Sequence, residues 1–400
     1  MILALACTDG ASQSPSKRRA DDETVETVET GDTGDTGDSA EPVDTADALL
    51  ARLRADFDTA VLEISGDSGW PAAVEGGWLF VIEDTGDWSV AGDFDDWVGE
   101  GMTREDGFSW VVLDAQGAYK FTDGVDWLAD PWSRAYTYDD NGEMSLLDPE
   151  EAHLERLFSV HDRTIRAWIP AGEVTHTLYA QDGQNLFDPE AFWGGWHLQE
   201  SAPDGMLIVG IDNTDARFDE YTHVPDLLYG DWYGGDGDAY VDWMQDELRP
   251  LVAATWGESG PVGLLGSSLG GLISLHAAGR LEGEFAFAAS MSGTLGWGSI
   301  GTDNETMIER YAAAGHRDTA IYLDSGGSGD CVDSDGDGIQ DDDPTASDNY
   351  CETLQMRDTL EAAGYTFDVD LWHWWEEDAE HNEAYWADRV WRPLEIFSAL

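Results

Sequence analysis

A Gly-Ser-Ser-Leu-Gly-Gly segment at residues 266–271 constrains the fold of this chain more than any other feature. The apolar run 262–265 before it is typical of a buried strand, and residues 269–280 after it have the apolar spacing of a helix. A serine on a sharp strand-to-helix turn needs small neighbours, because larger side chains would clash with the adjoining elements. We therefore predict that Ser268 is a nucleophile on a strained turn, with glycines on both sides.

Beyond Pro149, apolar runs alternate with longer amphipathic segments. This pattern is typical of a parallel sheet covered by helices, so we predict an α/β fold with a doubly wound, mostly parallel sheet in residues 151–400. The expected strands are 164–169, 177–180, 206–211, 262–265, 285–290, 320–323 and 367–372, and the expected helices are 240–254, 269–280 and 352–363.

The segment before Pro149 has a different sequence pattern, in which short β-type runs are separated by Gly and Asp turns. Such spacing predicts an all-β sandwich over residues 46–150. Five tryptophans there are open to two interpretations, a sugar-stacking platform or the core of a small sandwich. The expected strands are 78–83, 88–91, 109–113 and 118–122, and the tryptophans are Trp88, Trp97, Trp110, Trp127 and Trp132.

The chain carries 83 acidic and 19 basic residues, a formal net charge of −64. Nucleic acid is excluded as a partner, because phosphate binding needs a basic patch that this chain cannot assemble. A surface of this kind stays soluble at high ionic strength, where salt screens its self-repulsion. A saline habitat and an ordinary acidic exported protein both fit, and we expect a monomer.

The N-terminal segment predicts a membrane tether. Cys7 follows the apolar and small residues 3–6, which resembles the lipobox of bacterial lipoproteins. Residues 8–45 are mostly Thr, Asp, Glu and Gly, so they are expected to be a disordered linker. The segment before Cys7 is too short for a full signal peptide, which suggests a start codon further upstream. We expect residues 1–45 to anchor an extracytoplasmic protein to a bacterial membrane through lipid. If Cys7 is a chance cysteine, a secreted protein is the alternative.

A serine nucleophile needs a base within hydrogen-bond reach, and nine histidines are available. His381 lies after the last expected strand, where the base of a strand–serine–helix fold should fall. The triad order of such folds is serine, then acid, then histidine. We predict Asp330 as the acid that orients His381, with Asp348 as the main alternative and Asp324 as a turn-former at the strand end.

Four segments of the chain resemble one family of α/β-hydrolases, from about residue 163 onward. That family includes enterochelin esterases, S-formylglutathione hydrolases, feruloyl esterases and mycolyltransferases. The segments are LYAQDGQNLFD (178–188), IVGIDNTDARFDEYT (208–222), GSSLGG (266–271) and EHNEAYW (380–386).

The resemblance implies which groups surround the serine. It implies that the backbone N–H of Leu269, together with that of Gly183 or Gln184, holds the oxyanion. Three further residues match a family motif near the cleft, although a structural ion-pair cluster explains them equally well: Arg217, Glu220 and Tyr221.

The N-terminal part carries a second resemblance. The segments VAGDFDDW (90–97), YKFTDG (119–124) and DPWSR (130–134) are similar to the immunoglobulin-like modules of glycogen-branching enzymes. They resemble the N-terminal domain of enterochelin esterases still more, so an immunoglobulin-like sandwich is expected.

An acidic insertion between Cys331 and Cys351 departs from the family pattern. Its alternating aspartates have the oxygen-ligand spacing of a calcium loop and resemble a thrombospondin-type repeat, without the terminal Glu of an EF-hand. We predict a structural calcium ion, no cofactor for catalysis, and a disulfide between the two cysteines worth about 3 kcal/mol. A solvated acidic loop is the alternative. The expected ligands are Asp333, Asp335, Asp337 and Asp341.

Together these features predict a serine esterase that works through an acyl-enzyme. Candidate substrates are siderophore esters of the enterochelin type, small esters, and acyl groups linked to polysaccharide. An acyltransferase is one alternative, and a non-catalytic surface module that binds glycan or calcium is another.

Overall fold

The computed structural model describes residues 45–67, 69–84, 86–342 and 347–400. The expected lipidation site, Cys7, lies outside the described residues, as does almost all of the predicted tether. No helix within the described ranges is both long and apolar enough to cross a bilayer.

Two helices begin the described chain, α1 (Ala46–Ala55) and α2 (Phe57–Asp67). Thr45 caps α1, because its hydroxyl accepts a hydrogen bond from the Ala48 N–H at 3.2 Å. The leucines of α1 share one buried face and pack, with Val61 and Ile64 of α2, against the first strands. These helices were not expected, since residues 46–150 were predicted to be all β.

Ten strands follow, and every strand expected in this segment is present. Two sheets face one another, because Phe80 and Ile82 from one sheet and Tyr119 and Phe121 from the other fill a common core. Their classification as immunoglobulin-like stays a prediction. The strands are β1 (Ala72–Val74), β2 (Gly77–Ile82), β3 (Ser89–Gly92), β4 (Glu100–Gly101), β5 (Thr103–Arg104), β6 (Ser109–Leu113), β7 (Gly117–Thr122), β8 (Trp127–Leu128), β9 (Ala135–Asp139) and β10 (Gly142–Leu147).

The tryptophans of this segment divide between core and surface. Trp88 is buried, and Trp110 and Trp132 pack against the core beneath α1 and α2. Trp97 and the exposed Trp127 instead form a pair with ring centroids 5.9 Å apart. The core interpretation therefore applies to three of the five.

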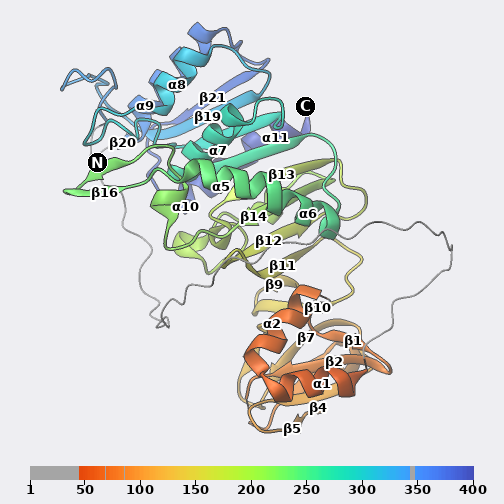
Figure 1. The fold of residues 1–400 in the computed structure, drawn as a ribbon. Helices are drawn as coiled ribbons and strands as arrows, with labels where there is room; N and C mark the ends of the chain where they lie inside the picture. Colours follow the sequence, from red (N-terminus) through yellow and green to blue (C-terminus); the bar gives the residue numbers. More distant parts are fainter. Residues whose placement is uncertain (1–44, 68, 85, 343–346) are drawn as a thin grey trace, which may run out of the picture.

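The larger sheet runs without a break from the N-terminal strands into the C-terminal half (Figure 1). Strand β11 (His153–Val160) joins the halves by pairing with β9 on one side and β12 (Arg163–Ile169) on the other. Arg156 of β11 reinforces this seam with bonds to Glu143 at 2.8 and 3.1 Å and to two backbone carbonyls. The boundary expected at residue 150 therefore falls inside a continuous sheet.

The C-terminal half of this sheet is mostly parallel, as predicted. The parallel strands lie in the order β14-β13-β17-β18-β19-β21. Their carboxyl ends share one edge, and Ser268 lies at that edge directly after β17. The strands are β13 (His176–Gln181), β14 (Met206–Ile211), β17 (Val262–Ser267), β18 (Phe287–Met291), β19 (Ala320–Gly327) and β21 (Leu371–Glu376), with short strands β15 (Asp226–Leu228), β16 (Asp231–Tyr233) and β20 (Ser347–Asp348) in the loops.

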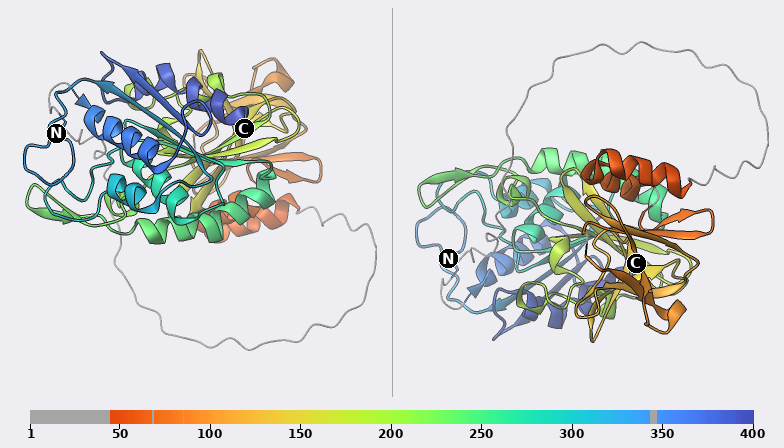
Figure 2. Two further views of the ribbon diagram at one scale, coloured as in Figure 1. Left: turned by 90° about the horizontal axis from the view of Figure 1, so that it is seen from above. Right: turned by 90° about the horizontal axis from the view of Figure 1, so that it is seen from below.

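Helices cover both faces of the parallel strands (Figure 2). One core cluster joins helices α5 to α9 to one face, and a second joins α3, α10 and α11 to the other. The helices are α3 (Leu198–Ser201), α4 (Arg217–Glu220), α5 (Gly237–Trp243), α6 (Arg249–Trp256), α7 (Leu269–Arg280), α8 (Met307–Ala314), α9 (Tyr350–Ala363), α10 (Glu383–Arg389) and α11 (Trp391–Ser398), with short helices η1 (Asp93–Asp95), η2 (Gly183–Asn185), η3 (Phe192–Gly194) and the π-helical η4 (Met244–Leu248).

The last expected strand is displaced along the chain. Residues 366–370 form a turn, in which Asp368 has a φ of 61° and the Thr366 carbonyl accepts hydrogen bonds from the N–H groups of residues 369–371. Strand β21 therefore begins at Leu371 instead of residue 367. The sequence pattern missed this because Phe367 and Val369 are apolar yet exposed.

Candidate active site

Ser268 occupies the strained turn that its neighbours predict. Its φ of 54° and ψ of −125° lie in a region that side-chain-bearing residues rarely adopt, between β17 and α7. A Cβ atom on Gly266 would lie 2.3 Å from the Gly270 carbonyl oxygen, so only glycine fits there. The turn leaves the Ser268 side chain partly exposed at the carboxyl edge of the sheet.

The loop after β13 packs against the first turn of α7. An added Cβ on Gly270 would lie 3.0 Å from the Gln181 Cβ and 3.1 Å from an Asp182 carboxylate oxygen. Leu269 is the first residue of α7, so its N–H has no acceptor within the helix, and the positive end of the helix dipole faces the turn. Gly183 begins η2 in the neighbouring loop. The role of both residues as oxyanion donors stays a prediction.

Arg217, Glu220 and Tyr221 were open to a role in the cleft or in a structural ion-pair cluster. They belong to such a cluster beside the loop after β13. Arg217 binds both oxygens of Asp182 at 2.7 and 2.8 Å. The Tyr221 hydroxyl accepts a hydrogen bond from the Asp182 N–H at 3.3 Å, and Glu220 pairs with Arg163 at 2.7 Å. The cluster holds the backbone of the loop in place, which is a supporting role.

His381 lies in the loop between β21 and α10 and bonds directly to an aspartate. Its Nδ1 is 2.6 Å from Oδ1 of Asp348, and the Trp386 ring contacts the imidazole edge-on at 5.0 Å. A histidine whose Nδ1–H is held by a carboxylate presents Nε2 as the proton acceptor. The pair thus has the chemistry of a general base and its orienting acid.

The structure does not bring Asp330 to His381, so the predicted acid needs correction. Asp330 is exposed beyond the end of β19, whereas Asp348 is fully buried. The reason is that the acidic insertion returns to the sheet, where Ser347 and Asp348 pair antiparallel with the last residues of β19. The acid at His381 therefore comes from the far end of the insertion.

The surroundings of Asp348 favour its ionised form. Burial opposes ionisation, but hydrogen bonding and charge from His381, with Arg389 and Ser292, hold the pKa of Asp348 below its ordinary value. Asp348 is therefore a carboxylate near neutral pH, as an acid that stabilises an imidazolium must be.

Two polar residues beside the serine carried no signal in the sequence. The Thr294 hydroxyl lies 3.4 Å from that of Ser268, and Asn349 donates to the same threonine oxygen at 3.2 Å. Asn349 directly follows Asp348, so one short segment carries the acid and a contact to the serine side of the site. Nothing in the local sequence distinguishes these two residues from other polar residues in loops.

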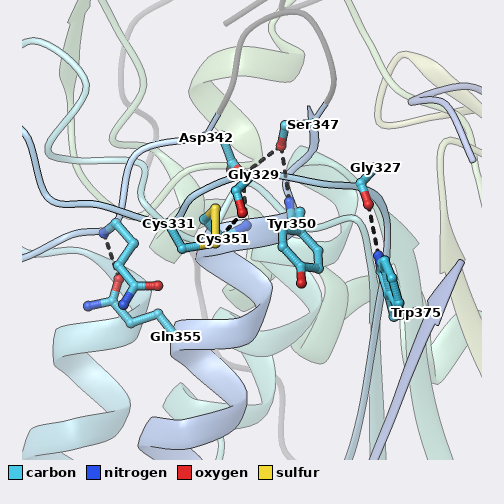
Figure 3. Close-up of a disulfide and its surroundings, with 10 residues drawn as sticks. Gly327, Gly329, Cys331, Asp342, Ser347, Tyr350, Cys351, Gln355 and Trp375 are labelled. Carbon is cyan, nitrogen blue, oxygen red and sulfur yellow. Dashed lines mark hydrogen bonds between the residues drawn. A yellow bond between two sulfur atoms is a disulfide. The ribbon is translucent and has the colours of Figure 1, made fainter. Parts of the chain in front are cut away.

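The predicted disulfide is present and closes the acidic insertion. Cys331 and Cys351 are bonded with their Cα atoms 5.1 Å apart, and Cys351 is buried in the first turn of α9 (Figure 3). Beside it, Asp342 accepts hydrogen bonds from the Cys351 N–H at 2.7 Å and the Ser347 hydroxyl at 2.5 Å. Asp348 therefore lies within the segment that the disulfide brackets.

Three of the four predicted calcium ligands lie together. Asp333, Asp335 and Asp337 can each direct one carboxylate oxygen to within 4.8 Å of the others. Asp341 is outside this group and instead accepts hydrogen bonds from the N–H and hydroxyl of Ser334. Three converging carboxylate oxygens suit a hard cation such as calcium.

A family model matches the C-terminal half of the chain. The model of the family described as Putative esterase matches residues 161–392. The uncharacterized Bacillus subtilis protein YbbA is 31% identical over 123 residues, or 29% of this chain. The match covers 49% of that relative, so this chain spans about half of its length.

Several solved structures are also similar. An IroE-like serine hydrolase from Shewanella oneidensis gives a TM-score of 0.46 at 18% identity, over 62% of this chain and 80% of its own. The enterobactin esterase from Shigella flexneri gives a TM-score of 0.44 at 15% identity, and the match covers 80% of this chain and 92% of the esterase. A siderophore hydrolase from Aspergillus nidulans gives a TM-score of 0.46 at 18% identity, and the match covers 64% of this chain and 97% of the hydrolase.

Proposed function

Because the chain belongs to the Putative esterase family, whose model matches more than half of it, we propose that it hydrolyses carboxylic esters with Ser268 as the nucleophile. The observation that carries this proposal is the position of Ser268, on a strained turn between β17 and α7. Family membership assigns the reaction class, ester hydrolysis, and the acyl-enzyme mechanism is our inference.

In the proposed mechanism, the Ser268 oxygen attacks the ester carbonyl while His381 Nε2 accepts the serine proton. The N–H groups of Leu269 and Gly183 stabilise the negative oxygen of the tetrahedral intermediate. His381 then donates its proton to the leaving alcohol, which gives an acyl-serine, and water activated by His381 releases the acid. Asp348 stabilises the imidazolium formed in each half-reaction.

Exposed aromatic side chains on the catalytic edge support a substrate with rings. Trp193 follows β13, and Tyr229 and Trp232 lie in or beside the β15–β16 hairpin that follows β14. Loops after the carboxyl ends of parallel strands surround the crevice at which such sheets bind ligands. The net charge of −64 disfavours polyanions. We propose an uncharged ester, such as an acyl group on a polysaccharide, in preference to an anionic siderophore complex.

We expect p-nitrophenyl butyrate to be a better substrate than the p-nitrophenyl monoester of succinate, which adds one carboxylate. At low salt the kcat/KM for the butyrate ester should exceed that for the succinate monoester by about tenfold or more, because the acidic surface repels the anion. The ratio should narrow between 0.01 and 1 M NaCl, as the Debye length falls from about 30 to 3 Å. A preference for the anion at low salt would refute the substrate proposal. The absence of turnover with either ester would contradict the proposal that the chain hydrolyses esters.

We also propose that calcium binds Asp333, Asp335 and Asp337 and stabilises the fold without taking part in the chemistry. An ion that binds only the folded state adds about 2.7 kcal/mol at a hundredfold excess over its Kd. Chelation should therefore lower the melting temperature by several degrees, and added calcium should restore it. Asp335→Ala should remove this response, while Asp330→Asn, with the same charge change, should keep it. A melting temperature insensitive to chelator at low salt would show that the loop is only solvated.

We propose that the protein acts outside the cytoplasm. The Cys331–Cys351 disulfide supports this, because disulfides persist in oxidising compartments. The lipid anchor at Cys7 remains part of the same proposal.

A further inference from the structure

A buried arginine lies behind the His381–Asp348 pair. Arg389, the last residue of α10, is 1% exposed and contacts two carboxylates that are fully buried. Its Nε is 3.0 Å from Asp324 Oδ1, and its Nη2 is 3.0 Å from Asp348 Oδ2. Taking three charges out of water is costly, so such a cluster persists only when every charge is paired.

The contacts around Asp348 fix the plane of its carboxylate. Oδ2 accepts three hydrogen bonds, from the Ser292 hydroxyl at 2.6 Å, the Gly326 N–H at 2.8 Å and Arg389. Oδ1 bonds to His381 Nδ1. Because rotation of the carboxylate would break all three bonds to Oδ2, the oxygen that faces His381 is determined by Arg389 and its neighbours.

The same helix holds the other members of this network. Trp386 and Arg389 are three residues apart on α10, so both point to the same side of the helix. Trp386 donates to the Ser292 hydroxyl at 3.0 Å and contacts the His381 ring. Arg389 donates to the same hydroxyl at 2.6 Å, while the Ser292 N–H bonds to the Asp324 carbonyl at 2.8 Å.

The charges of the cluster alternate when His381 is protonated. Asp324, Arg389, Asp348 and the imidazolium then carry −, +, − and +, which sums to zero in a buried site. With neutral His381 and both aspartates ionised, the cluster has one uncompensated negative charge, so protonation of His381 during turnover completes the pairing of charges. Burial raises the pKa of Asp324 to about 6, against the effect of Arg389, so Asp324 is largely ionised at neutral pH.

Other groups face this cluster. The Tyr322 hydroxyl donates to Asp324 at 3.0 Å. Glu383 lies on the first turn of α10, and burial raises its pKa, while the charge of His381 opposes that rise. Arg389 joins the side chain of Asp324 to that of Asp348, while Ser292 joins the Asp324 backbone carbonyl to the Asp348 carboxylate.

From this geometry we propose that Arg389 is a positioning residue for the proposed ester hydrolysis, and that Asp324 holds the Arg389 guanidinium in place. Arg389 fixes the Asp348 carboxylate, and its planar guanidinium spans two carboxylates as a lysine ammonium cannot. The inference rests on the proposed function of Ser268 and His381. It adds a second layer of charged residues to that site.

The test compares Arg389→Lys and Asp324→Asn with a control, Arg392→Lys, in the next helix. The Arg392 guanidinium lies over the rings of Trp374 and Trp391. Arg389→Lys should lower kcat about 10- to 100-fold with little change in KM, the usual cost of losing a supporting contact. Asp324→Asn should lower kcat in the same direction, because Arg389 then loses one of the two carboxylates that hold its guanidinium. The control should match the parent.

Proton NMR of histidine-labelled protein supplies a readout that needs no turnover. The short Nδ1–H bond of His381 should give a downfield resonance in the parent and in Ser268→Ala, and it should move or broaden in Arg389→Lys and Asp324→Asn. Parent-like resonances and parent-like kcat values in both variants, measured below their melting temperatures, would overturn the proposal. Loss of activity that follows only the unfolded fraction would overturn it too. An ester hydrolase that keeps turnover in Ser268→Ala would instead refute the proposed mechanism while leaving this resonance test intact.

Discussion

Ser268→Ala is expected to lower ester turnover by a factor on the order of 10⁴ to 10⁶, because it removes the oxygen that forms the acyl-enzyme. The residual rate would come from substrate binding and from the oxyanion donors at Leu269 and Gly183. The melting temperature should stay close to that of the parent, since the Ser268 hydroxyl has one long contact, 3.4 Å to Thr294. Steady-state kinetics with p-nitrophenyl butyrate and thermal melting measure the two quantities.

The adjoining serine provides a matched control for this experiment. Ser267 is the buried last residue of β17, so Ser267→Ala makes the same chemical change one position away, on the sheet side of the turn. It should keep turnover within a few-fold of the parent. Equal losses in the two variants would mean that the turn has been disturbed, and near-parent turnover in a pure preparation of Ser268→Ala would exclude Ser268 as the nucleophile.

Asp348→Asn is expected to lower kcat by about 10⁴, whereas Asp330→Asn should leave it nearly unchanged. An asparagine beside His381 no longer stabilises the Nδ1–H tautomer or the imidazolium, although the size of the side chain is preserved. Asp330 is exposed and lies away from His381, so its loss removes one surface charge. Parallel kinetics on the two variants measure the difference.

Stability must be followed in the same variants, because Asp348→Asn also breaks the pair with Arg389. The pKa of Asp348 is lowered in the folded state, so its ionised form stabilises the fold above the pKa of the unfolded chain. That contribution disappears as the pH falls through the folded value. Assays near neutral pH and below both melting temperatures therefore isolate the catalytic effect. A larger kcat loss in Asp330→Asn would return the role of the acid to that residue.

The serine and the histidine could be predicted from the sequence because their signals are local. A glycine-flanked serine between an apolar strand and a helix has few structural solutions, and the structure places Ser268 on that turn. The histidine follows from chain order, since the loop after the last parallel strand ends at the same edge. Both inferences required only the order of the strands along the chain and the position of each residue after its strand.

Asp330 was the preferred acid and Asp348 the alternative, and the sequence could not decide between them because the position of the acid depends on the path of a long insertion. Asp330 is near the end of β19 along the chain, but the strand continues to Gly327 and the chain leaves the site before it returns. Asp324 was expected at a turn, yet it is a fully buried strand residue paired with Arg389. Sequence spacing gives no information about where a loop of this length rejoins the sheet.

Strand β11 joins the two halves of this protein into one continuous sheet, so neither half is structurally independent at this edge. If the chain were cut near residue 150 to isolate the catalytic half, β11 would lose its partner β9 and become an edge strand with bare N–H and C=O groups. Arg156 would at the same time lose the Glu143 carboxylate that neutralises it. The N-terminal strands thus cover an edge of the catalytic sheet, and a catalytic half expressed alone would need a redesigned β11 edge to stay soluble.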